Sequence, residues 1–453
     1  SVIIVWQGGM EGGTAVVDVL SGAETPSGKL ADTIAYSIED YPSTKNFGNE
    51  FKNLYEEDIY IGYRYFETFA PDKVQFEFGY GLSYTTFDIE TQTVKEKTDS
   101  IELNVKVTNT GDKFAGKEVV QVYYEAPQGE LGKPARELIA FAKTKKLAPG
   151  ESQELTLEFK ISDMASYDDS GVTGHKSCYV LEAGEYNIYV GNSVKNLTKI
   201  NTYNEEELVV VEELQEAMAP TEAINIMKPG KKNADGTYEV TYVPVSTQIT
   251  GDMGITLQDV RDGKATLEKF VAQLSIEEMA IIIRGEGMSN PRVTRGTASA
   301  FGGMSDSLFN YGIPAACCAD GPSGLRMEGK ATQLPIGTAL SATWNTELVR
   351  ELYTMEGQEL YRNQVDTLLG PGVNIRRNPL NGRNFEYFSE DPFLSGKMSV
   401  ASTGGIKDGG AWGTIKHFAL NGQESHRFKI DAVCSERAIR EIYLKSNVHY
   451  DII

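Results

Sequence analysis

Cationic side chains are scarce in this sequence of 453 residues. Lysine and arginine number 43 against 64 aspartates and glutamates, which gives a formal net charge of −21 at pH 7. A protein surface of that sign repels phosphate backbones and anionic lipid headgroups. We therefore expect no nucleic-acid partner and no membrane partner.

Cysteines and long apolar runs are also scarce. The 4 cysteines, of which Cys317 and Cys318 are adjacent, form neither a disulfide framework nor the Cys-x-x-Cys spacing of a metal site. No stretch approaches the roughly 18 consecutive apolar residues that a membrane-spanning helix needs. These absences predict a protein without a metal site that folds in a reducing compartment.

The sequence is rich in glycine and tyrosine, with 45 and 23 residues, and 40% of its residues are hydrophobic. This composition is typical of a folded, turn-rich protein, because a disordered chain has fewer apolar groups. At about 150 residues per domain, the length predicts roughly three domains.

Residues 1–86 begin with the pattern of an α/β unit. The apolar run at 2–5 predicts a buried strand, residues 7–13 a glycine-rich loop, and residues 14–20 a helix. Nothing before the predicted strand can pair with it, and the helical pattern at 436–445 runs on without a stop signal. We therefore expect the sequence to be cut from a longer protein at both ends.

Residues 87–203 change to a period of two. Apolar and polar side chains alternate in the runs 101–107 and 155–159, with turn residues between such segments. This alternation predicts an antiparallel β-sandwich. Residues 204–250 carry clusters of glutamate and lysine, which predict a solvated linker.

Residues 251–453 return to helical periodicity. Apolar side chains at i, i+3, i+4 and i+7 in 267–274 predict one helix, and Ser275 with Glu278 fits a capping box for the next. Further on, a helix at 347–364 is followed by short strands at 368–370 and 413–418. Repeated β-α units of this length predict a (β/α) barrel, here incomplete.

Polar clusters follow the predicted strands of this last region, where the βα loops of a barrel place functional groups. They lie at 320–326, 377–386, 416–418 and 421–427. Carboxylate oxygens accept hydrogen bonds from the vicinal hydroxyls of a sugar, while cations and an imidazole donate to the other hydroxyls. The sequence therefore predicts a sugar-binding site.

Each residue of these clusters also has an ordinary structural explanation. Asp320 could cap a turn, and Arg383 with Glu386 could form a surface ion pair that contributes little. His417 alone could be a core histidine with satisfied hydrogen bonds. Only the joint occurrence of these residues in one β-α region favours a binding site.

The same residues carry a resemblance to a known family. The segments Asp320-Gly-Pro-Ser-Gly-Leu-Arg326, Gly382-Arg-Asn-Phe-Glu-Tyr-Phe-Ser-Glu-Asp391 and Lys416-His-Phe418 resemble the barrel domain of glycoside hydrolase family 3, the β-glucosidases and their relatives. Four segments of the first region are similar to the α/β-sandwich domain of that family: residues 7–13, 26–30, 62–65 and 78–84.

The resemblance implies a multidomain fold of α/β and all-β parts. Residues 1–86 would form a partial α/β-sandwich domain, 87–203 a fibronectin type III-like domain, 204–250 a linker, and 251–453 an incomplete TIM-type barrel. This order is similar to that of the domain-inverted β-glucosidases of some anaerobic bacteria.

The resemblance also implies an activity, namely retaining hydrolysis of terminal nonreducing β-D-glucosyl residues from β-glucosides and cello-oligosaccharides, with no cofactor. Asp320 would be the carboxylate that binds hydroxyls of the terminal sugar. The remaining residues of that subsite would be Arg326, Arg383, Lys416, His417 and Arg427.

Retaining hydrolysis needs an aspartate nucleophile and a glutamate acid/base about 5 Å apart. We assign neither. The nucleophile of the family lies in an Asp-Trp motif, and none of Trp6, Trp344 and Trp412 follows an aspartate. The acid/base segment would precede Ser1. We therefore expect both catalytic carboxylates outside this sequence and no activity for the chain alone.

The loop after Lys416-His-Phe418 separates subclasses of the family. N-acetylglucosaminidases carry Pro-Gly-His-Gly followed by Asp-Ser-His there, whereas residues 419–424 of this chain read Ala-Leu-Asn-Gly-Gln-Glu, which favours a glucosidase. A β-xylosidase of the same family and a noncatalytic carbohydrate-binding or scaffold protein stay open as alternatives. We expect a location in the bacterial cytoplasm, with secretion left open, as is a homodimer of the full-length parent.

Overall fold

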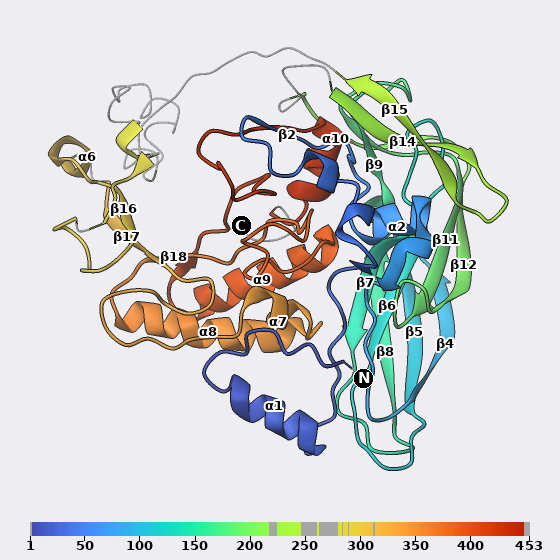
Figure 1. Cartoon of the computed structure of the whole chain (residues 1–453), viewed down its shortest axis with the longest axis horizontal. Coiled ribbons are helices and arrows are strands. Elements are labelled where there is room, and N and C mark those ends of the chain that lie inside the picture. The colour runs from blue at the N-terminus through green and yellow to red at the C-terminus, as the bar shows by residue number, and fades with distance from the viewer. Residues whose placement is uncertain are drawn as a thin grey trace.

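Figure 1 shows the chain in a computed structural model, with antiparallel sheets beside the helices of the C-terminal third. The structure describes residues 2–216, 224–245, 261, 280–282, 284–288, 290–310 and 313–447. Within these ranges, no helix combines the length and the apolar character that crossing a membrane requires. The predicted helices around 267–278 lie outside the described residues.

The predicted β-sandwich is confirmed. One sheet has the order β4-β5-β8 and another the order β12-β11-β6-β7, both antiparallel. The period-two pattern of β5 buries Ile101, Leu103, Val105 and Val107 completely between the sheets. The strands from Phe87 to Glu205, of which β9 and β10 belong to a third sheet, are β4 (Phe87–Glu96), β5 (Ser100–Asn109), β6 (Val119–Glu125), β7 (Glu137–Lys143), β8 (Ser152–Lys160), β9 (Ser166–Asp168), β10 (Cys178–Leu181), β11 (Gly184–Gly191) and β12 (Leu197–Glu205).

Residues 204–250 hold three strands where the charge clusters predict a solvated linker. They are β13 (Val209–Glu213), β14 (Ile224–Lys232) and β15 (Tyr238–Val245). Strand β13 pairs with β10, while β14 and β15 form a hairpin. The prediction fails because β-branched residues between the charges supply strand faces, and Ile226 lies buried on one of them.

The first region contains few regular elements. They are α1 (Gly12–Ser21), β1 (Ile34–Ala35), β2 (Lys52–Leu54), α2 (Tyr63–Phe69) and β3 (Val74–Phe76). The helix predicted at 14–20 is confirmed as α1. The buried strand predicted at 2–5 is wrong, since these residues form no strand and Val2 is 82% exposed. A strand needs the hydrogen bonds of a neighbour, and the described part of the chain supplies none there.

The C-terminal region alternates strands and helices, as the sequence predicts. Strands β17, β18 and β19 are parallel neighbours, and β16 pairs with β17 in the opposite direction. The elements are β16 (Ser299–Gly302), α6 (Asp306–Asn310), β17 (Ala315–Asp320), α7 (Gly337–Ser341), α8 (Thr346–Arg362), β18 (Thr367–Leu369), α9 (Pro392–Asp408), β19 (Trp412–Gly413), β20 (Asp431–Val433) and α10 (Glu436–Ala438), which continues as a π-helical turn to Tyr443.

Two sequence expectations for this region need correction. The strand predicted at 413–418 ends at Gly413; the N–H of Thr414 still donates to the carbonyl of Leu368 at 2.8 Å, and beyond it Lys416 makes an isolated bridge to Gly372. The helix predicted at 436–445 is divided between α10 and the π-helical turn.

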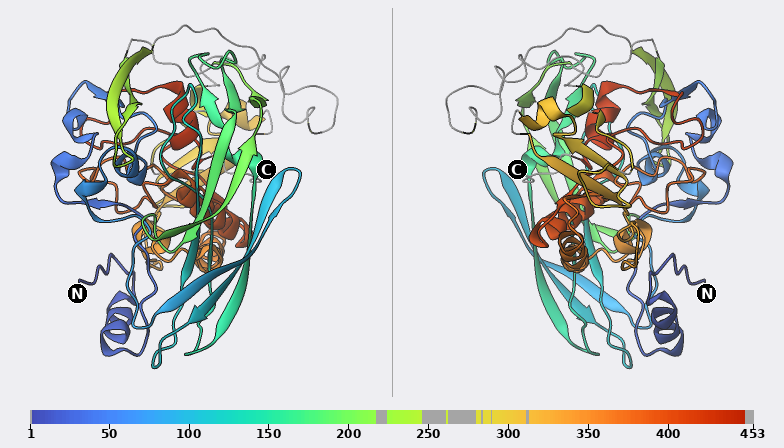
Figure 2. Two further views of the ribbon diagram at one scale, coloured as in Figure 1. Left: turned by 90° about the vertical axis from the view of Figure 1, so that its right-hand side faces the viewer. Right: turned by 90° about the vertical axis from the view of Figure 1, so that its left-hand side faces the viewer.

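One apolar core joins all three regions. Trp344 follows α7, is 1% exposed, and lies in contact with Phe78 of the first region and Phe141 of β7 at ring-centroid distances of 5.4 and 5.1 Å. Its indole N–H donates a hydrogen bond to the carbonyl of Lys29 at 3.2 Å. Figure 2 shows the β-sandwich in front of α8 and α9 in one view and behind them in the other. The regions are therefore packed on one another rather than strung along the chain.

Two buried carboxylates fix the N-terminal end of α9 to the first region. Glu390 accepts hydrogen bonds from the backbone N–H and hydroxyl of Thr33, at 2.8 and 2.6 Å, and from the N–H of Tyr63 at 2.9 Å. Asp391 accepts from the Tyr63 hydroxyl and from Arg64 Nη1, both at 2.8 Å, and caps α9 through the N–H of Leu394. These contacts leave one orientation for the loop before α9.

We expect Asp391→Ala to lower the free energy of unfolding by roughly 3–5 kcal/mol, because it removes a helix cap and a buried partner of Arg64. Urea unfolding followed by tryptophan fluorescence measures this loss. The control is Lys95→Ala, which removes an exposed ion pair with Glu102 and should leave the transition almost unchanged. Equal transitions for the two variants would contradict the role of Asp391.

Candidate functional site

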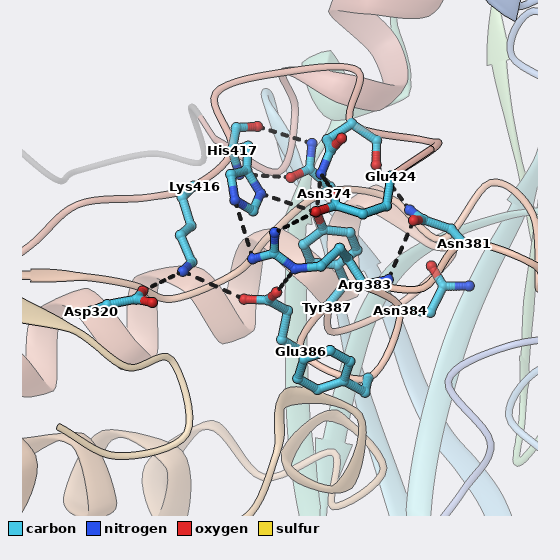
Figure 3. Close-up of polar contacts among 12 residues, drawn as sticks. Asp320, Asn374, Asn381, Arg383, Asn384, Glu386, Tyr387, Lys416, His417 and Glu424 are labelled. Carbon is cyan, nitrogen blue, oxygen red and sulfur yellow. Dashed lines mark hydrogen bonds and ion pairs between the residues drawn. The ribbon is translucent and has the colours of Figure 1, made fainter. Parts of the chain in front are cut away.

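The candidate site lies at the carboxyl ends of the parallel strands. Asp320 is the last residue of β17, and Lys416 and His417 follow β19. Arg383 and Glu386 lie in the long loop between β18 and α9. Carboxyl ends of neighbouring parallel strands share one edge of the sheet, which brings these distant residues together, as Figure 3 shows.

Lys416 lies between two carboxylates. Its Nζ is 2.8 Å from Asp320 Oδ1 and 3.7 Å from Glu386 Oε2 (Figure 3). The Lys416 side chain is 14% exposed, and that of Glu386 is 2% exposed. Glu386 Oε2 has no hydrogen-bond partner among the residues that the structure describes. The Lys416 ammonium, a hydrogen-bond donor, and Glu386 Oε2, an acceptor without a partner in the described part of the chain, therefore lie side by side.

Arg383 connects Glu386 of its own loop with His417 and Glu424. Its Nε pairs with Glu386, its Nη1 is 3.3 Å from Glu424 Oε1, and its Nη2 is 3.3 Å from His417 Nε2. Asn381 and Asn374 hold the surrounding loops, because Asn381 donates to the carbonyl of Asn421 and Asn374 exchanges two hydrogen bonds with the backbone of His417. The guanidinium is thus held in place before any ligand arrives.

The local charges set the protonation of Asp320 and His417. Burial alone would raise the pKa of Asp320, but the hydrogen bond and the charge of Lys416 outweigh it, so the pKa lies below the usual value. Burial, together with the charges of Arg383 and Lys416, lowers the pKa of His417 to about 4. At neutral pH the site therefore presents a carboxylate at Asp320 and an uncharged imidazole at His417.

The structure brings four of the six predicted site residues together: Asp320, Arg383, Lys416 and His417. Arg427 lies at the edge, where it pairs with Glu424 and its guanidinium covers the ring of Phe428. Arg326 is farther out, since its side chain is 82% exposed and approaches Asp320 only to 3.5 Å. The roles assigned to all six in sugar binding stay predictions.

Sequence reasoning missed part of the site. A surface ion pair of Glu386 with Arg383 was the ordinary alternative to a binding role; the pair exists, but its carboxylate is buried. An Arg and a Glu three residues apart can form an exposed pair or a buried pair, so the sequence does not indicate that Glu386 is buried. Tyr387, Asn421 and Glu424 also belong to the hydrogen-bonded group around His417.

The loop that carries Asn421, Glu424 and Arg427 is held by the first region. The N–H of Gly48 donates to Gln423 Oε1 at 2.7 Å, and Gln423 Nε2 donates to the carbonyl of Asn49 at 2.9 Å. Just beyond this loop, β20 pairs in parallel with β2. The site is therefore built on the β-α region but positioned by residues 48–54.

The chemistry of this group suits a ligand with several hydroxyls. Carboxylate oxygens, an ammonium, a guanidinium and an imidazole lie within hydrogen-bonding distance of one another, and each can exchange its present partner for a hydroxyl. Within the described ranges, no three His, Cys, Asp or Glu side chains are grouped so as to hold a metal ion. The arrangement supports binding of a polyol through direct hydrogen bonds.

Comparison with known proteins finds three family profiles along the chain. The profile of the glycosyl hydrolase family 3 C-terminal domain matches residues 1–84, that of the fibronectin type III-like domain residues 118–194, and that of the glycosyl hydrolase family 3 N terminal domain residues 255–451. The candidate site lies within the last of these matches.

Similarity along nearly the whole of this chain is found to β-glucosidases. The chain is 52% identical to a β-glucosidase of Ruminococcus albus, over 98% of this chain and 48% of that protein. It is 41% identical to β-glucosidase A of Butyrivibrio fibrisolvens, over 98% of this chain and 59% of that protein. The crystal structure of a β-glucosidase from Paenibacillus barengoltzii shares 61% sequence identity and a TM-score of 0.91, over 98% of this chain and 51% of that one. The chain thus spans about half the length of these relatives.

We expect the His417 ring to stay neutral until the pH falls to about 4, because burial and two neighbouring cations oppose its protonation. The folded pKa lies below the ordinary value of 6.5, so the contribution of this ring to stability is complete above pH 6.5 and is lost as the pH falls toward 4. A proton NMR titration of the ring, assigned by its loss in His417→Asn, measures the midpoint. A midpoint near 6.5 would contradict the arrangement around Arg383 and Lys416.

Proposed function

The chain belongs to glycosyl hydrolase family 3, and from that membership we propose that the site around Asp320 binds the terminal, nonreducing glucosyl residue of a β-glucoside. The observation that carries the proposal is the bridge of Lys416 between Asp320 and Glu386 at the carboxyl ends of parallel strands. The bridge places acceptors on both sides of a donor, which is the pattern that vicinal hydroxyls of a pyranose match.

The balance of charge at the site supports a neutral sugar. Three carboxylates, those of Asp320, Glu386 and Glu424, are paired with Lys416, Arg383 and Arg427, and a fourth cation, Arg326, approaches Asp320 from solvent with a side chain that is 82% exposed. An anionic ligand such as a sugar phosphate would need a surplus of cations, since a buried charge must be paired. Glucose brings hydroxyls that replace hydrogen bonds without adding a charge.

For the whole protein of which this chain spans a part, we propose hydrolysis of β-glucosides with retention of configuration. The relatives that match nearly all of this chain are β-glucosidases by name, which supports this activity. In the proposed reaction the Asp320 site holds the glucosyl ring at its hydroxyls, so that the bond to the leaving group is oriented toward the catalytic carboxylates. We assign no nucleophile and no acid/base within the chain.

Calorimetric titration of the purified chain with glucose tests the binding site directly, and we expect a dissociation constant on the order of millimolar or tighter. Hydrolysis of an aryl β-glucoside by the whole protein tests the activity. Glucose binding without hydrolysis by the whole protein would leave a carbohydrate-binding protein and would end the hydrolase proposal. A folded chain that binds no glucose would contradict the site itself.

We expect Asp320→Asn to weaken glucose binding roughly 10- to 100-fold, because the substitution replaces a charged acceptor of sugar hydroxyls and leaves Lys416 with a neutral partner. The same titration measures this loss. The matched control is Asp88→Asn, an exposed residue of β4, which should leave the dissociation constant unchanged. Unaltered affinity in a folded Asp320→Asn protein would remove Asp320 from the site.

A further inference from the structure

Both ring nitrogens of His417 contact side chains of the protein. Nδ1 is 3.0 Å from the Tyr387 hydroxyl oxygen, and Nε2 is 3.3 Å from Arg383 Nη2. The same hydroxyl oxygen lies 2.9 Å from Asn421 Nδ2. Figure 3 shows the imidazole between the phenol of Tyr387 and the guanidinium of Arg383. The donor and acceptor capacity of these groups decides where the proton of His417 is.

Arg383 settles the role of Nε2. A guanidinium carries only donors, so its contact at 3.3 Å is a hydrogen bond only when Nε2 presents a lone pair. A neutral imidazole with a lone pair on Nε2 carries its proton on Nδ1. The low pKa of the ring keeps it neutral at pH 7. His417 is therefore the Nδ1–H tautomer, and Nδ1 donates to Tyr387.

Asn421 settles the role of the Tyr387 oxygen. Its Nδ2 lies 2.9 Å from that oxygen and 3.2 Å from Glu424 Oε2. An ionised carboxylate only accepts, so the atom facing Glu424 is the amide nitrogen, and this fixes the orientation of the side-chain amide. Asn421 thus donates to Tyr387, whose oxygen can accept from both Asn421 and His417.

The alternative tautomer makes fewer hydrogen bonds. With the proton on Nε2, Tyr387 donates to Nδ1 and accepts from Asn421, but the Nε2–H then faces an N–H of the positively charged Arg383. That state has two hydrogen bonds and a repulsive contact between donors, whereas the Nδ1–H state has three hydrogen bonds. The count favours the Nδ1–H state, although it leaves the hydroxyl hydrogen of Tyr387 without an acceptor among the residues that the structure describes.

We propose that His417 meets the sugar as the Nδ1–H tautomer that Arg383 selects, and that Tyr387 is a positioning residue: its hydroxyl oxygen accepts from Nδ1–H and fixes the ring, so that Nε2 accepts a hydrogen bond from a sugar hydroxyl that takes the place of Arg383. This inference rests on the proposed function for its ligand. It reverses the polarity expected from the sequence, where the imidazole was to donate. When a sugar hydroxyl takes its place at Nε2, Arg383 keeps Glu386 and Glu424 as partners, and its Nη2 becomes available to donate to the sugar.

Nitrogen NMR of the full chain with ¹⁵N-labelled histidine reads the tautomer without any ligand. The chain has 4 histidines, and the His417 signals are assigned by their absence in His417→Asn. We expect a protonated-type shift at Nδ1 and an acceptor-type shift at Nε2 in the unsubstituted protein. The reverse pattern would overturn the proposal without any appeal to a variant.

Tyr387→Phe tests the positioning role. We expect the ¹⁵N shift of Nδ1 to move and glucose binding to weaken roughly 3- to 10-fold, because Nδ1–H loses its partner and the ring its fixed orientation, whereas the contact with Arg383 keeps the Nδ1–H tautomer. Tyr186→Phe is the matched control: it removes a hydroxyl that donates to the Glu182 carbonyl at 2.9 Å within the β-sandwich, and it should change neither the tautomer nor the affinity. Thermal melting of both variants shows whether they fold alike.

The outcomes separate this inference from the proposed function. An unsubstituted protein that binds no glucose contradicts the proposed function, while its ¹⁵N shifts still report whether His417 is the Nδ1–H tautomer. A Tyr387→Phe protein that binds glucose with equal affinity and shows an unchanged ¹⁵N shift at Nδ1 overturns the role of Tyr387 alone. A Tyr387→Phe protein that melts early leaves the shifts of the unsubstituted protein as the deciding measurement.

Discussion

The pairing of Glu390 and Asp391 with donors of the first region is the constraint on which the rest of this structure depends. A carboxylate removed from water loses several kcal/mol of hydration unless hydrogen bonds replace it. Thr33, Tyr63 and Arg64 supply those hydrogen bonds, and Thr33 is 357 positions from Glu390 in the chain. The buried carboxylates of the loop before α9 and the donors of the first region lack hydrogen-bond partners unless the two segments meet. This requirement allows only one way of packing them together.

The candidate site inherits its geometry from this constraint. The loop that carries Arg383 and Glu386 is anchored at its far end by Glu390 and at its near end by Arg377, which pairs with Glu57 and donates to Asn53 Oδ1 at 2.6 Å. The loop with Glu424 is anchored through Gln423. The partners of these three residues all lie in the first region, so the β-α region supplies the side chains of the site while the first region helps to fix their positions. Loops held in this way lose little conformational freedom when a ligand binds.

The parts of the fold that follow from local periodicity could be predicted from the sequence, and the parts that depend on distant partners could not. The alternation in β5 and the helical stretch of α8 are properties of neighbouring residues, and both elements form as predicted. The hairpin of β14 and β15 lies among charge clusters, and residues 2–5 are apolar without a strand partner, so local composition misled in both cases. Asp320, Lys416 and His417 were found because they carry a motif. Tyr387 was missed because its role exists only in its contacts with His417 and Asn421.

The small number of cationic side chains is reflected in the positions of lysine and arginine. Arg64, Arg377 and Arg437 are almost completely buried where the regions meet, and each is hydrogen-bonded to carboxylates or backbone carbonyls of a distant segment. An acidic protein has carboxylates everywhere, so a buried cation finds a partner in any region, whereas a buried carboxylate depends on the few cations and on backbone N–H groups. Arginine occupies these contacts between regions because its planar guanidinium can donate to several acceptors at once. At the site the partly buried Lys416 and Arg383 are each shared between two carboxylates, and this sharing suits a ligand that brings hydroxyls and no charge.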